Sequence, residues 1–299
     1  MSLRSFHHSE FPADRLRAER EESISVCVPV REEAATIAGV VAPLVALRES
    51  GVIDQVVVVD ADSADRTADI AARLGAEVHR QVDLAPDFGP VAGKGDAMWR
   101  ALGVLTGEIV CFVDGDTEEF GEHFARGLLG PLVCEPRAQF VKGFYRRPFK
   151  DAGGVAPGGG GRVTELTARP LLATFYPALA GMRQPLAGEM AARRDLLESV
   201  AFCTGYAVEM GLLLDVYATV GLDAMAQVDL DVRQNRHQPL DDLAPMSAAV
   251  LAAVTSRLRR EGRLIGAGRD ELIERPALAE LRALRGAADT RHVGLYRDE

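Results

Sequence analysis

The first half of the chain alternates between short apolar runs and longer segments in which apolar residues recur at helical spacing. Four short runs predict strands at residues 23–30, 55–62, 76–82 and 108–114. The segments between them predict helices at residues 32–50, 63–75 and 93–107. Strands and helices that alternate in this way predict a Rossmann-like α/β fold, in which a mostly parallel sheet has helices on both faces.

The second half is less regular, and its expected elements differ in kind. In chain order they are a strand at 139–149, a glycine-rich loop at 151–166, a helix at 163–179 interrupted at Pro170, a helix at 205–221, and a strand with a polar loop at 225–243. From residue 244 onward the pattern is helical with mixed charge. We therefore divide the chain into a domain of residues 1–243 and a helical C-terminal extension of residues 244–299.

The charge of the chain narrows the choice of partners. The 299 residues carry a formal net charge of -10, whereas binding to nucleic acid requires a basic face. A small anionic substrate remains compatible, because local clusters of arginine can override the overall charge. The N-terminal segment is polar and charged, and no apolar run is long enough to span a bilayer. We therefore expect a cytoplasmic protein that binds neither nucleic acid nor a membrane.

Two acidic pairs stand at the ends of predicted strands, Asp60 with Asp62 and Asp114 with Asp116. Side chains at alternate strand positions share a face, so Asp114 and Asp116 are expected to point at one ligand. Two carboxylates near a nucleotide pyrophosphate suit Mg²⁺ or Mn²⁺, although Asp-Gly-Asp is also ordinary turn chemistry. Asp60 and Asp62 would accept hydrogen bonds from a base or a ribose, or would cap the next helix together with Ser63.

Other polar residues point to an anionic ligand. The first predicted strand is not followed by a G-x-G-x-x-G motif, which argues against NAD chemistry. Lys94 lies between two glycines at a helix start and suits a diphosphate, but the stretch lacks the full P-loop pattern. Arg162 and Thr164 follow four glycines, so backbone amides and a guanidinium can close on an anion. The alternative for both stretches is a solvated surface loop.

Two more residues are unusual for their surroundings. Glu209 lies in an otherwise apolar helical stretch and needs a partner, which would be a sugar hydroxyl or a structural contact at the helix N-terminus. His237 lies in a polar stretch that also holds Arg233 and Asn235. It suits a metal or a phosphate, although a lone histidine in a loop is more often neither.

Eight stretches together resemble the glucosyl-3-phosphoglycerate synthases, and the related mannosyl-3-phosphoglycerate synthases share the pattern. The stretches are VCVPVREEAATI, VVVVDADSADRT, GKGDAMWRAL, VDGDTEEF, FVKGFYRR, GGGRVTEL, QPLAGE and GYAVEMGLLLD. The early ones are common to GT-A glycosyltransferases, whereas GGGRVTEL and GYAVEMGLL are much more specific. The resemblance covers most of the chain from Ser23 onward. It implies a GT-A fold in which residues 1–243 bind the nucleotide sugar and the acceptor.

The resemblance also implies a reaction. A retaining, metal-dependent hexosyltransferase of this family moves glucose from UDP-glucose to the 2-hydroxyl of 3-phosphoglycerate, with Mg²⁺ or Mn²⁺ as cofactor, and acts as a homodimer. Two alternatives remain open at this point. The first is mannosyl transfer from GDP-mannose, and the second is a nucleotide-sugar-binding protein without turnover. A sugar nucleotidyltransferase is disfavoured, because the first strand is not followed by a glycine-rich loop with many basic residues.

The roles of individual residues are implied by the motifs that they match. The residues implied to bind the donor are Pro29, Val30, Glu33, Ser63, Lys94, Asp114, Tyr206 and Arg233. The residues implied to bind the acceptor are Gly161, Arg162, Thr164 and Asn235. The residues implied to act at the reacting centre are Asp116, Glu209, Arg162 and Leu186, the last through its backbone carbonyl.

The implied metal ligands are Asp116 and His237. Family members often have His-x-Asn after the arginine that matches Arg233, whereas this chain has Asn235-Arg236-His237. Strict spacing would put Asn235 at the ligand position. We assign the metal to His237, because imidazole is the better ligand and the loop can adjust.

Overall fold

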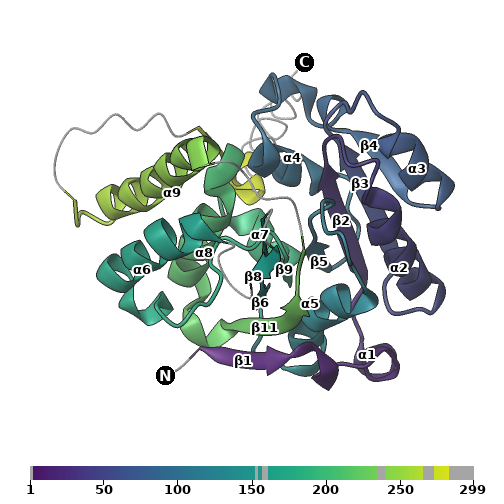
Figure 1. Ribbon diagram of the computed structural model, residues 1–299. Coiled ribbons are helices and arrows are strands. Elements are labelled where there is room, and N and C mark those ends of the chain that lie inside the picture. Colours follow the sequence, from purple (N-terminus) through teal and green to yellow (C-terminus); the bar gives the residue numbers. More distant parts are fainter. Residues whose placement is uncertain (1–2, 152–153, 157–160, 235–239, 265–272, 283–299) are drawn as a thin grey trace, which may run out of the picture.

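The centre of the molecule is an eight-stranded sheet (Figure 1). The computed structural model describes residues 3–151, 154–156, 161–234, 240–264 and 273–282. In spatial order the strands of the sheet are β1 (Arg4–His7), β11 (Met225–Val232), β6 (Phe140–Arg146), β9 (Met190–Arg193), β5 (Ile109–Phe112), β2 (Ile24–Val30), β3 (Gln55–Asp60) and β4 (Glu77–Arg80). Strand β9 runs antiparallel to both of its neighbours, and the other strands are parallel to one another. The prediction of a mostly parallel sheet is confirmed.

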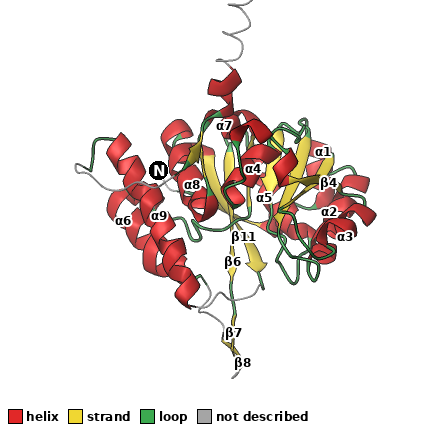
Figure 2. Cartoon of the chain, turned by 90° about the horizontal axis from the view of Figure 1, so that it is seen from above, coloured by secondary structure: helices red, strands yellow, loops and turns green. Residues whose placement is uncertain are grey.

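Helices cover both faces of the sheet, as Figures 1 and 2 show. They are α1 (Ala13–Glu19), α2 (Ile37–Glu49), α3 (Thr67–Arg73), α4 (Lys94–Ala101), α5 (Glu122–Cys134), α6 (Arg169–Phe175), α7 (Arg194–Ser199), α8 (Val208–Val220) and α9 (Leu240–Arg260). Successive residues of β2 point to opposite faces of the sheet and pack in different hydrophobic cores. Cys27 packs in the core that includes α4 and α8, whereas Val26 and Val28 pack in the core that includes α2 and α5. The sheet is thus apolar on both faces, as parallel sheets generally are.

Two strands of the sheet were not predicted from the sequence. Strand β1 lies in the charged N-terminal segment and pairs in parallel with β11 along one edge of the sheet. Strand β9 follows the QPLAGE stretch and inserts between β5 and β6. Near Pro170, the expected interruption takes the form of a π-helical turn, Thr164–Ala168, which leads directly into α6.

The C-terminal part contributes a strand as well as a helix. Helix α9 begins at Leu240, and β12 (Glu274–Arg275) pairs with the short strand β10 (Phe202–Cys203). The buried Arg257 of α9 forms ion pairs with Asp215 of α8 and Glu274 of β12, so it ties the three elements together. The division of the chain after residue 243 stays a prediction. Among the described helices, none combines the length and the apolar character that a bilayer crossing needs.

Outside the main sheet, a two-stranded hairpin of β7 (Phe149–Asp151) and β8 (Gly154–Ala156) projects from the body of the molecule (Figure 2). It directly follows β6 in the chain. The next described residue after the hairpin is Gly161, which the sequence predicts to bind the acceptor.

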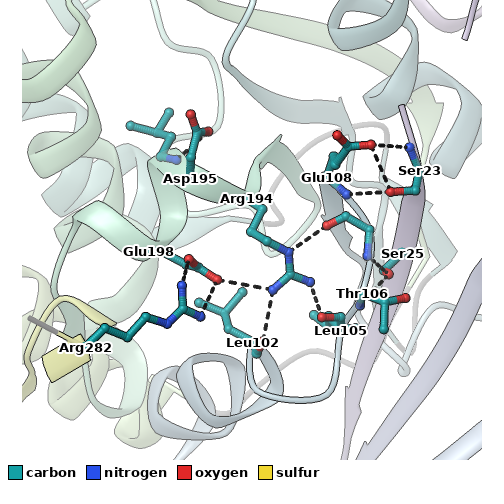
Figure 3. A network of polar contacts seen from close by, with 12 residues as sticks. Ser23, Ser25, Leu102, Leu105, Thr106, Glu108, Arg194, Asp195, Glu198 and Arg282 are labelled. Atoms are coloured by element: carbon teal, nitrogen blue, oxygen red, sulfur yellow. Dashed lines mark hydrogen bonds and ion pairs between the residues drawn. The ribbon is translucent and has the colours of Figure 1, made fainter. Parts of the chain in front are cut away.

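A single arginine holds the connection between α4 and β5 (Figure 3). The Arg194 guanidinium donates to the carbonyl oxygens of Leu102 at 3.1 Å and Gly107 at 2.8 Å, and it also contacts that of Leu105. At the end of the same connection, Glu108 accepts hydrogen bonds from the backbone and the hydroxyl of Ser23. Carbonyls away from water need such partners, and here one cation supplies several. The connection is important because α4 carries Lys94 and β5 leads into Asp114.

Candidate active site

The two carboxylates of the Asp-Gly-Asp stretch converge on one cationic nitrogen. Asp114 and Asp116 follow β5, and both contact Nη2 of Arg233, Asp114 through its Oδ2 atom at 3.0 Å. The prediction that both side chains point at one ligand is therefore consistent with their placement. Asp116 is the more open of the two, since 37% of its side chain is exposed. A ligand from solvent reaches Asp116 first.

Lys94 closes the same cluster from the other side. Its Nζ lies 2.5 Å from Oδ1 of Asp114 and 3.0 Å from Oε1 of Glu209. The partner that the buried Glu209 carboxylate requires is thus Lys94. Helix α4 reaches this position because Gly95 packs directly on the backbone of β10, where a Cβ atom would lie only 1.9 Å from the Cys203 carbonyl oxygen.

The surroundings keep Asp114 ionised. Burial alone would raise the pKa of this carboxyl, but the positive charges of Lys94 and Arg233 outweigh burial and lower it well below its ordinary value. Burial likewise disfavours the charged form of Lys94, yet the carboxylates of Asp114 and Glu209 raise its pKa above the usual range. Each charge in the cluster is stable only because the opposite charges are present.

Beneath the cluster lies a buried polar floor that the sequence analysis did not identify. Glu189 is fully buried and forms an ion pair with Arg233 at 3.1 Å, from Oε1 to Nε. The hydroxyl of Tyr145 donates to Oε2 of Glu189 at 2.8 Å and accepts from Nη1 of Arg233 at 2.9 Å. Glu189 and Tyr145 therefore hold the Arg233 guanidinium on its buried side, and the same guanidinium contacts the Asp-Gly-Asp carboxylates.

Lys142 is the second fully buried charge of this floor. Its ammonium group donates to the carbonyl oxygen of Ala187, next to Leu186 in the chain. Burial lowers the pKa of Lys142 to about 8, while Glu209 opposes that shift. Lys142 interrupts the apolar pattern of β6, and Glu189 directly precedes the apolar strand β9, so the sequence signal for both is a charge beside an apolar run.

The loops that follow β2, β3 and β5 are bound to one another. The Ser63 hydroxyl accepts the backbone N–H of Glu32 at 2.9 Å and donates to Asp60 at 2.6 Å. The Thr36 hydroxyl donates to the carbonyl oxygen of Gly115 at 2.7 Å. These bonds join the loop expected to bind uridine to the loop that carries the acidic pair. Both carboxylate oxygens of Asp60 accept hydrogen bonds from Ser63, one from the backbone N–H and one from the hydroxyl of Ser63.

Pro29 and Val30 end β2 beside the acidic pair. Gly115 packs against Val30 so closely that a Cβ atom there would lie 2.6 Å from a methyl group of Val30. In the loop after β2, the backbone N–H of Glu33 donates to Thr67 at the start of α3. Val30 therefore lies next to the glycine between the two carboxylates, whereas Glu33 lies in a loop that is bound to α3.

A small cavity contains two of the four expected acceptor residues, Gly161 and Thr164. It is lined by Tyr145, Arg147, Gly161, Thr164, Glu165, Gln184, Leu186 and Ala187. Gly161, whose φ of 75° lies in the left-handed region, turns the chain into the helical segment that presents Thr164. Tyr145 lines this cavity and also contacts Arg233, so one side chain connects the cavity to the acidic pair.

Four expected residues do not belong to either group. Arg162 follows Gly161 in the chain but is not among the residues that line the cavity. Tyr206 lies in the short 3-10 helix Gly205–Ala207, and 54% of it is exposed. Its proposed place beside Glu209 in a sugar pocket stays a prediction. Asn235 and His237 lie outside the described residues, so the choice between them as metal ligand also stays a prediction.

The residues present fit a hard divalent cation. Asp114 and Asp116 offer carboxylate oxygens that already share one cationic partner, which shows that a positive charge can sit between them. Mg²⁺ and Mn²⁺ prefer such oxygen ligands and share them with phosphate groups. Arg233 and Lys94 are then free to contact the phosphate oxygens of a nucleotide.

A mostly parallel α/β sheet with an acidic pair and basic side chains at its strand ends, beside a second polar cavity, defines a nucleotide-sugar glycosyltransferase of the GT-A class. The family model described as "Glycosyl transferase family 2" matches residues 25–179. The chain is 45% identical to a glucosyl-3-phosphoglycerate synthase of Mycolicibacterium smegmatis, over 82% of this chain and 80% of that protein. The chain therefore belongs to glycosyl transferase family 2 and, within it, to the glucosyl-3-phosphoglycerate synthase family.

Two solved structures are similar to this one over nearly the whole chain. A mannosyl-3-phosphoglycerate synthase from Rubrobacter xylanophilus has 46% identity and a TM-score of 0.85, and the match covers 93% of this chain and 96% of that one. The glucosyl-3-phosphoglycerate synthase from Mycobacterium tuberculosis has 38% identity and a TM-score of 0.82, with 94% and 99% covered. That enzyme has been solved in complex with Mn²⁺, UDP-glucose and phosphoglyceric acid, and with Mg²⁺ and UDP.

Gly188 offers a test of the geometry at Asp114. A Cβ atom at Gly188 would lie 2.3 Å from one carboxylate oxygen of Asp114 and 2.4 Å from the other. Gly188→Ala must therefore displace this carboxylate, and we expect kcat/KM for sugar transfer to fall by about 100-fold, as for a misplaced catalytic group. Steady-state kinetics with varied metal checks this.

The control for this substitution is Gly181→Ala in the same connection. A Cβ atom at Gly181 meets nothing within 4 Å, so its kinetics should match those of the wild type. Equal kinetics for Gly188→Ala and the wild type would show that the position of the Asp114 carboxylate does not limit the reaction.

Proposed function

We propose that this chain transfers glucose from UDP-glucose to the 2-hydroxyl of 3-phosphoglycerate, with retention at the anomeric carbon and with Mg²⁺ or Mn²⁺ as cofactor. The observation that carries the proposal is the juxtaposition of two polar sites. The cavity with Gly161, Thr164 and Leu186 lies one side chain, Tyr145, away from the arginine that contacts the acidic pair. A sugar donor at one site and a small anionic acceptor at the other would meet near Leu186.

The donor half of the proposal rests on the ends of β2, β3 and β5. Uridine would lie against Pro29, Val30, Glu33 and Ser63, whose loops are hydrogen-bonded into one wall. The diphosphate would draw Lys94 and Arg233 away from the carboxylates. The metal, held by Asp116 with His237, would neutralise charge on the departing diphosphate. Glu209 would then be left to bind hydroxyl groups of the sugar.

The acceptor half rests on the segment from Gly161 to Thr164. Arg162 would pair with the phosphate or the carboxylate of 3-phosphoglycerate, since a guanidinium binds both through paired donors. Thr164 and the backbone at Gly161 would supply further hydrogen bonds. Asn235 is assigned to the acceptor as well. A positively charged contact of this kind lets a chain with a net charge of -10 hold a doubly charged acid.

Glu209 is an unsuitable nucleophile in this arrangement. Its carboxylate is engaged with Lys94 before the donor binds, and it would be occupied by sugar hydroxyl groups once the diphosphate has drawn Lys94 away. We therefore propose that the acceptor attacks on the same face from which the diphosphate leaves, and that no covalent glucosyl–enzyme forms. The carbonyl group of Leu186 would lie beside the reacting centre.

A second candidate function is mannosyl transfer from GDP-mannose to the same acceptor. The observation that favours it is the similarity to the R. xylanophilus mannosyl-3-phosphoglycerate synthase, whose TM-score is the higher of the two reported above. The acidic pair, Lys94 and Arg233 suit either nucleotide diphosphate. The base and the sugar pocket distinguish the two donors.

The proposal also includes a homodimer located in the cytoplasm. Both are expectations from the family resemblance. Sedimentation of the purified full chain would test the dimer.

A panel of donors and acceptors tests the function directly. UDP-glucose and GDP-mannose are each incubated with 3-phosphoglycerate, with and without Mg²⁺ or Mn²⁺, and the nucleotide released and the sugar product are measured. We expect fastest transfer from UDP-glucose, only with metal. A preference for GDP-mannose would establish the second candidate. Nucleotide release without an acceptor product, or no turnover with any pair, would contradict the proposed transfer.

Arg162→Ala tests the acceptor assignment separately. Loss of a charged hydrogen-bonding group is worth roughly 1.5–3 kcal/mol, so we expect KM for 3-phosphoglycerate to rise roughly 10- to 100-fold. KM for UDP-glucose should change less than twofold. Arg137→Ala, an exposed position between α5 and β6, is the control and should leave both constants unchanged. Equal losses for donor and acceptor would contradict the role of Arg162.

A further inference from the structure

Two histidines and a carboxylate from opposite ends of the chain meet at the β1 edge of the sheet. Nε2 of His8 lies 2.6 Å from Oδ2 of Asp231, and Nε2 of His7 lies 3.4 Å from Oδ1 of the same side chain. One ligand atom from each of the three residues can be chosen so that all lie within 4.8 Å of one another. We refer to His7, His8 and Asp231 as the edge cluster.

The local backbone explains why two adjacent histidines point the same way. Successive residues of a strand face opposite sides, but β1 ends at His7 and a 3-10 turn begins at His8. The two imidazole rings consequently lie almost side by side, with their centroids 4.4 Å apart and their planes at 34°. Both Nε2 atoms face the end of β11.

Asp231 reaches the histidines because β11 is irregular there. The pairing of β11 with β6 shifts register between Asp229 and Val232, and Asp231 has a φ of 66°. This bulge turns Asp231 toward β1. Two residues later Arg233 points to the Asp-Gly-Asp carboxylates, so the edge cluster and the candidate active site use different side chains of the same strand end.

Each histidine is held in position. The Nδ1 atom of His7 lies 2.7 Å from the Ser9 hydroxyl and 3.2 Å from the Ser9 backbone nitrogen, and both contacts orient the ring from behind. Metal binding through Nε2 requires the proton on Nδ1, from which it would be donated to the Ser9 hydroxyl. His8 packs on α5 beside the ring of His123, with centroids 4.7 Å apart, and Gly127 leaves room for it. Only 16% of the His8 side chain is exposed, compared with 42% for His7. The cluster is thus ordered on one side and open to water on the other.

We propose that the edge cluster binds one divalent ion of the zinc class, with Nε2 of His7, Nε2 of His8 and a carboxylate oxygen of Asp231 as ligands and water at the open position. Imidazole nitrogen with one carboxylate suits Zn²⁺ and its late first-row neighbours, whereas Mg²⁺ prefers oxygen alone. Ligand atoms around tetrahedral zinc lie about 3.3 Å apart, given bonds of about 2.0–2.2 Å. The two histidine–aspartate separations, 2.6 and 3.4 Å, lie on either side of this value, and the two histidine nitrogens lie within 4.8 Å of each other.

Such an ion would fasten β1 to the end of β11. Strand β1 has four residues and pairs only with β11 at the edge of the sheet, where contacts of Arg4 with Glu135 and of Ser5 with Gln227 also hold it. An ion bound by the native cluster and not by the unfolded chain stabilises the fold by mass action. This inference does not depend on the proposed sugar transfer.

The test is a titration of the full chain, without a histidine tag, with Zn²⁺ or with Co²⁺ as a spectroscopic probe. Saturating Mg²⁺ and UDP are present throughout to occupy the candidate active site. We expect one equivalent of Zn²⁺ to bind and to raise the melting temperature, and Co²⁺ to give the visible absorption of a nitrogen–oxygen site. Asp116→Ala should retain this binding, which separates it from the catalytic metal.

Substitutions in the edge cluster test whether its three residues are the Zn²⁺ ligands. His8→Ala and Asp231→Ala should each weaken Zn²⁺ binding at least tenfold, and the exposed His7→Ala should do so even if a more buried variant proves unstable. His79→Ala is the matched control, since His79 also contacts a carboxylate, that of Glu77, but on β4 at the opposite edge. Absence of Zn²⁺ binding under these conditions would overturn the proposal and leave hydrogen bonds as the only role. Unchanged binding in all three variants would also overturn it.

Discussion

The Asp114 carboxylate lies between Lys94 and Arg233, and the rest of the candidate active site depends on these two contacts. Each of the three residues comes from a different part of the chain: Lys94 from the start of α4, Asp114 from the end of β5 and Arg233 from the end of β11. Charges taken out of water are stable only when they are paired and hydrogen-bonded. Correct packing of the three elements is therefore a condition for every charge at the site.

The ion pairs of Asp114 with Lys94 and Arg233 also allow the site to rearrange when substrates bind. Four acidic groups face three basic ones here, with Glu189 and Glu209 below and beside the Asp-Gly-Asp pair. A divalent ion held by Asp116, beside Asp114, would compete with Arg233 and Lys94 for these carboxylates. A nucleotide diphosphate offers these two side chains new anionic partners at the same moment. Metal and nucleotide would thus promote each other's binding, and such a coupling would act equally in both directions.

The sequence predicted the parts of the site that lie in short local patterns. Asp114, Asp116, Pro29 and Lys94 each stand next to a buried strand or a glycine turn, and the alternation of strands and helices places strand ends at one edge. Lys142, Glu189 and Tyr145 escaped notice because they become a polar floor only when β9 inserts antiparallel beside β6. That pairing joins residues about fifty positions apart, and no local hydrophobic periodicity in the sequence indicates it. Strand β1 was missed for a similar reason, since a four-residue edge strand with charged neighbours has too few positions to show alternation.

The central claim, that basic side chains and metal compete for the same carboxylates, can be measured without any sugar transfer. The affinity of Mn²⁺ is compared between the wild type and Lys94→Met in the absence of nucleotide, with Arg73→Met on the exposed face of α3 as control. If Lys94 neutralises Asp114 in the absence of substrates, its removal should tighten Mn²⁺ binding, while the control binds as the wild type does. Weaker or unchanged Mn²⁺ binding in Lys94→Met would contradict this account of the site.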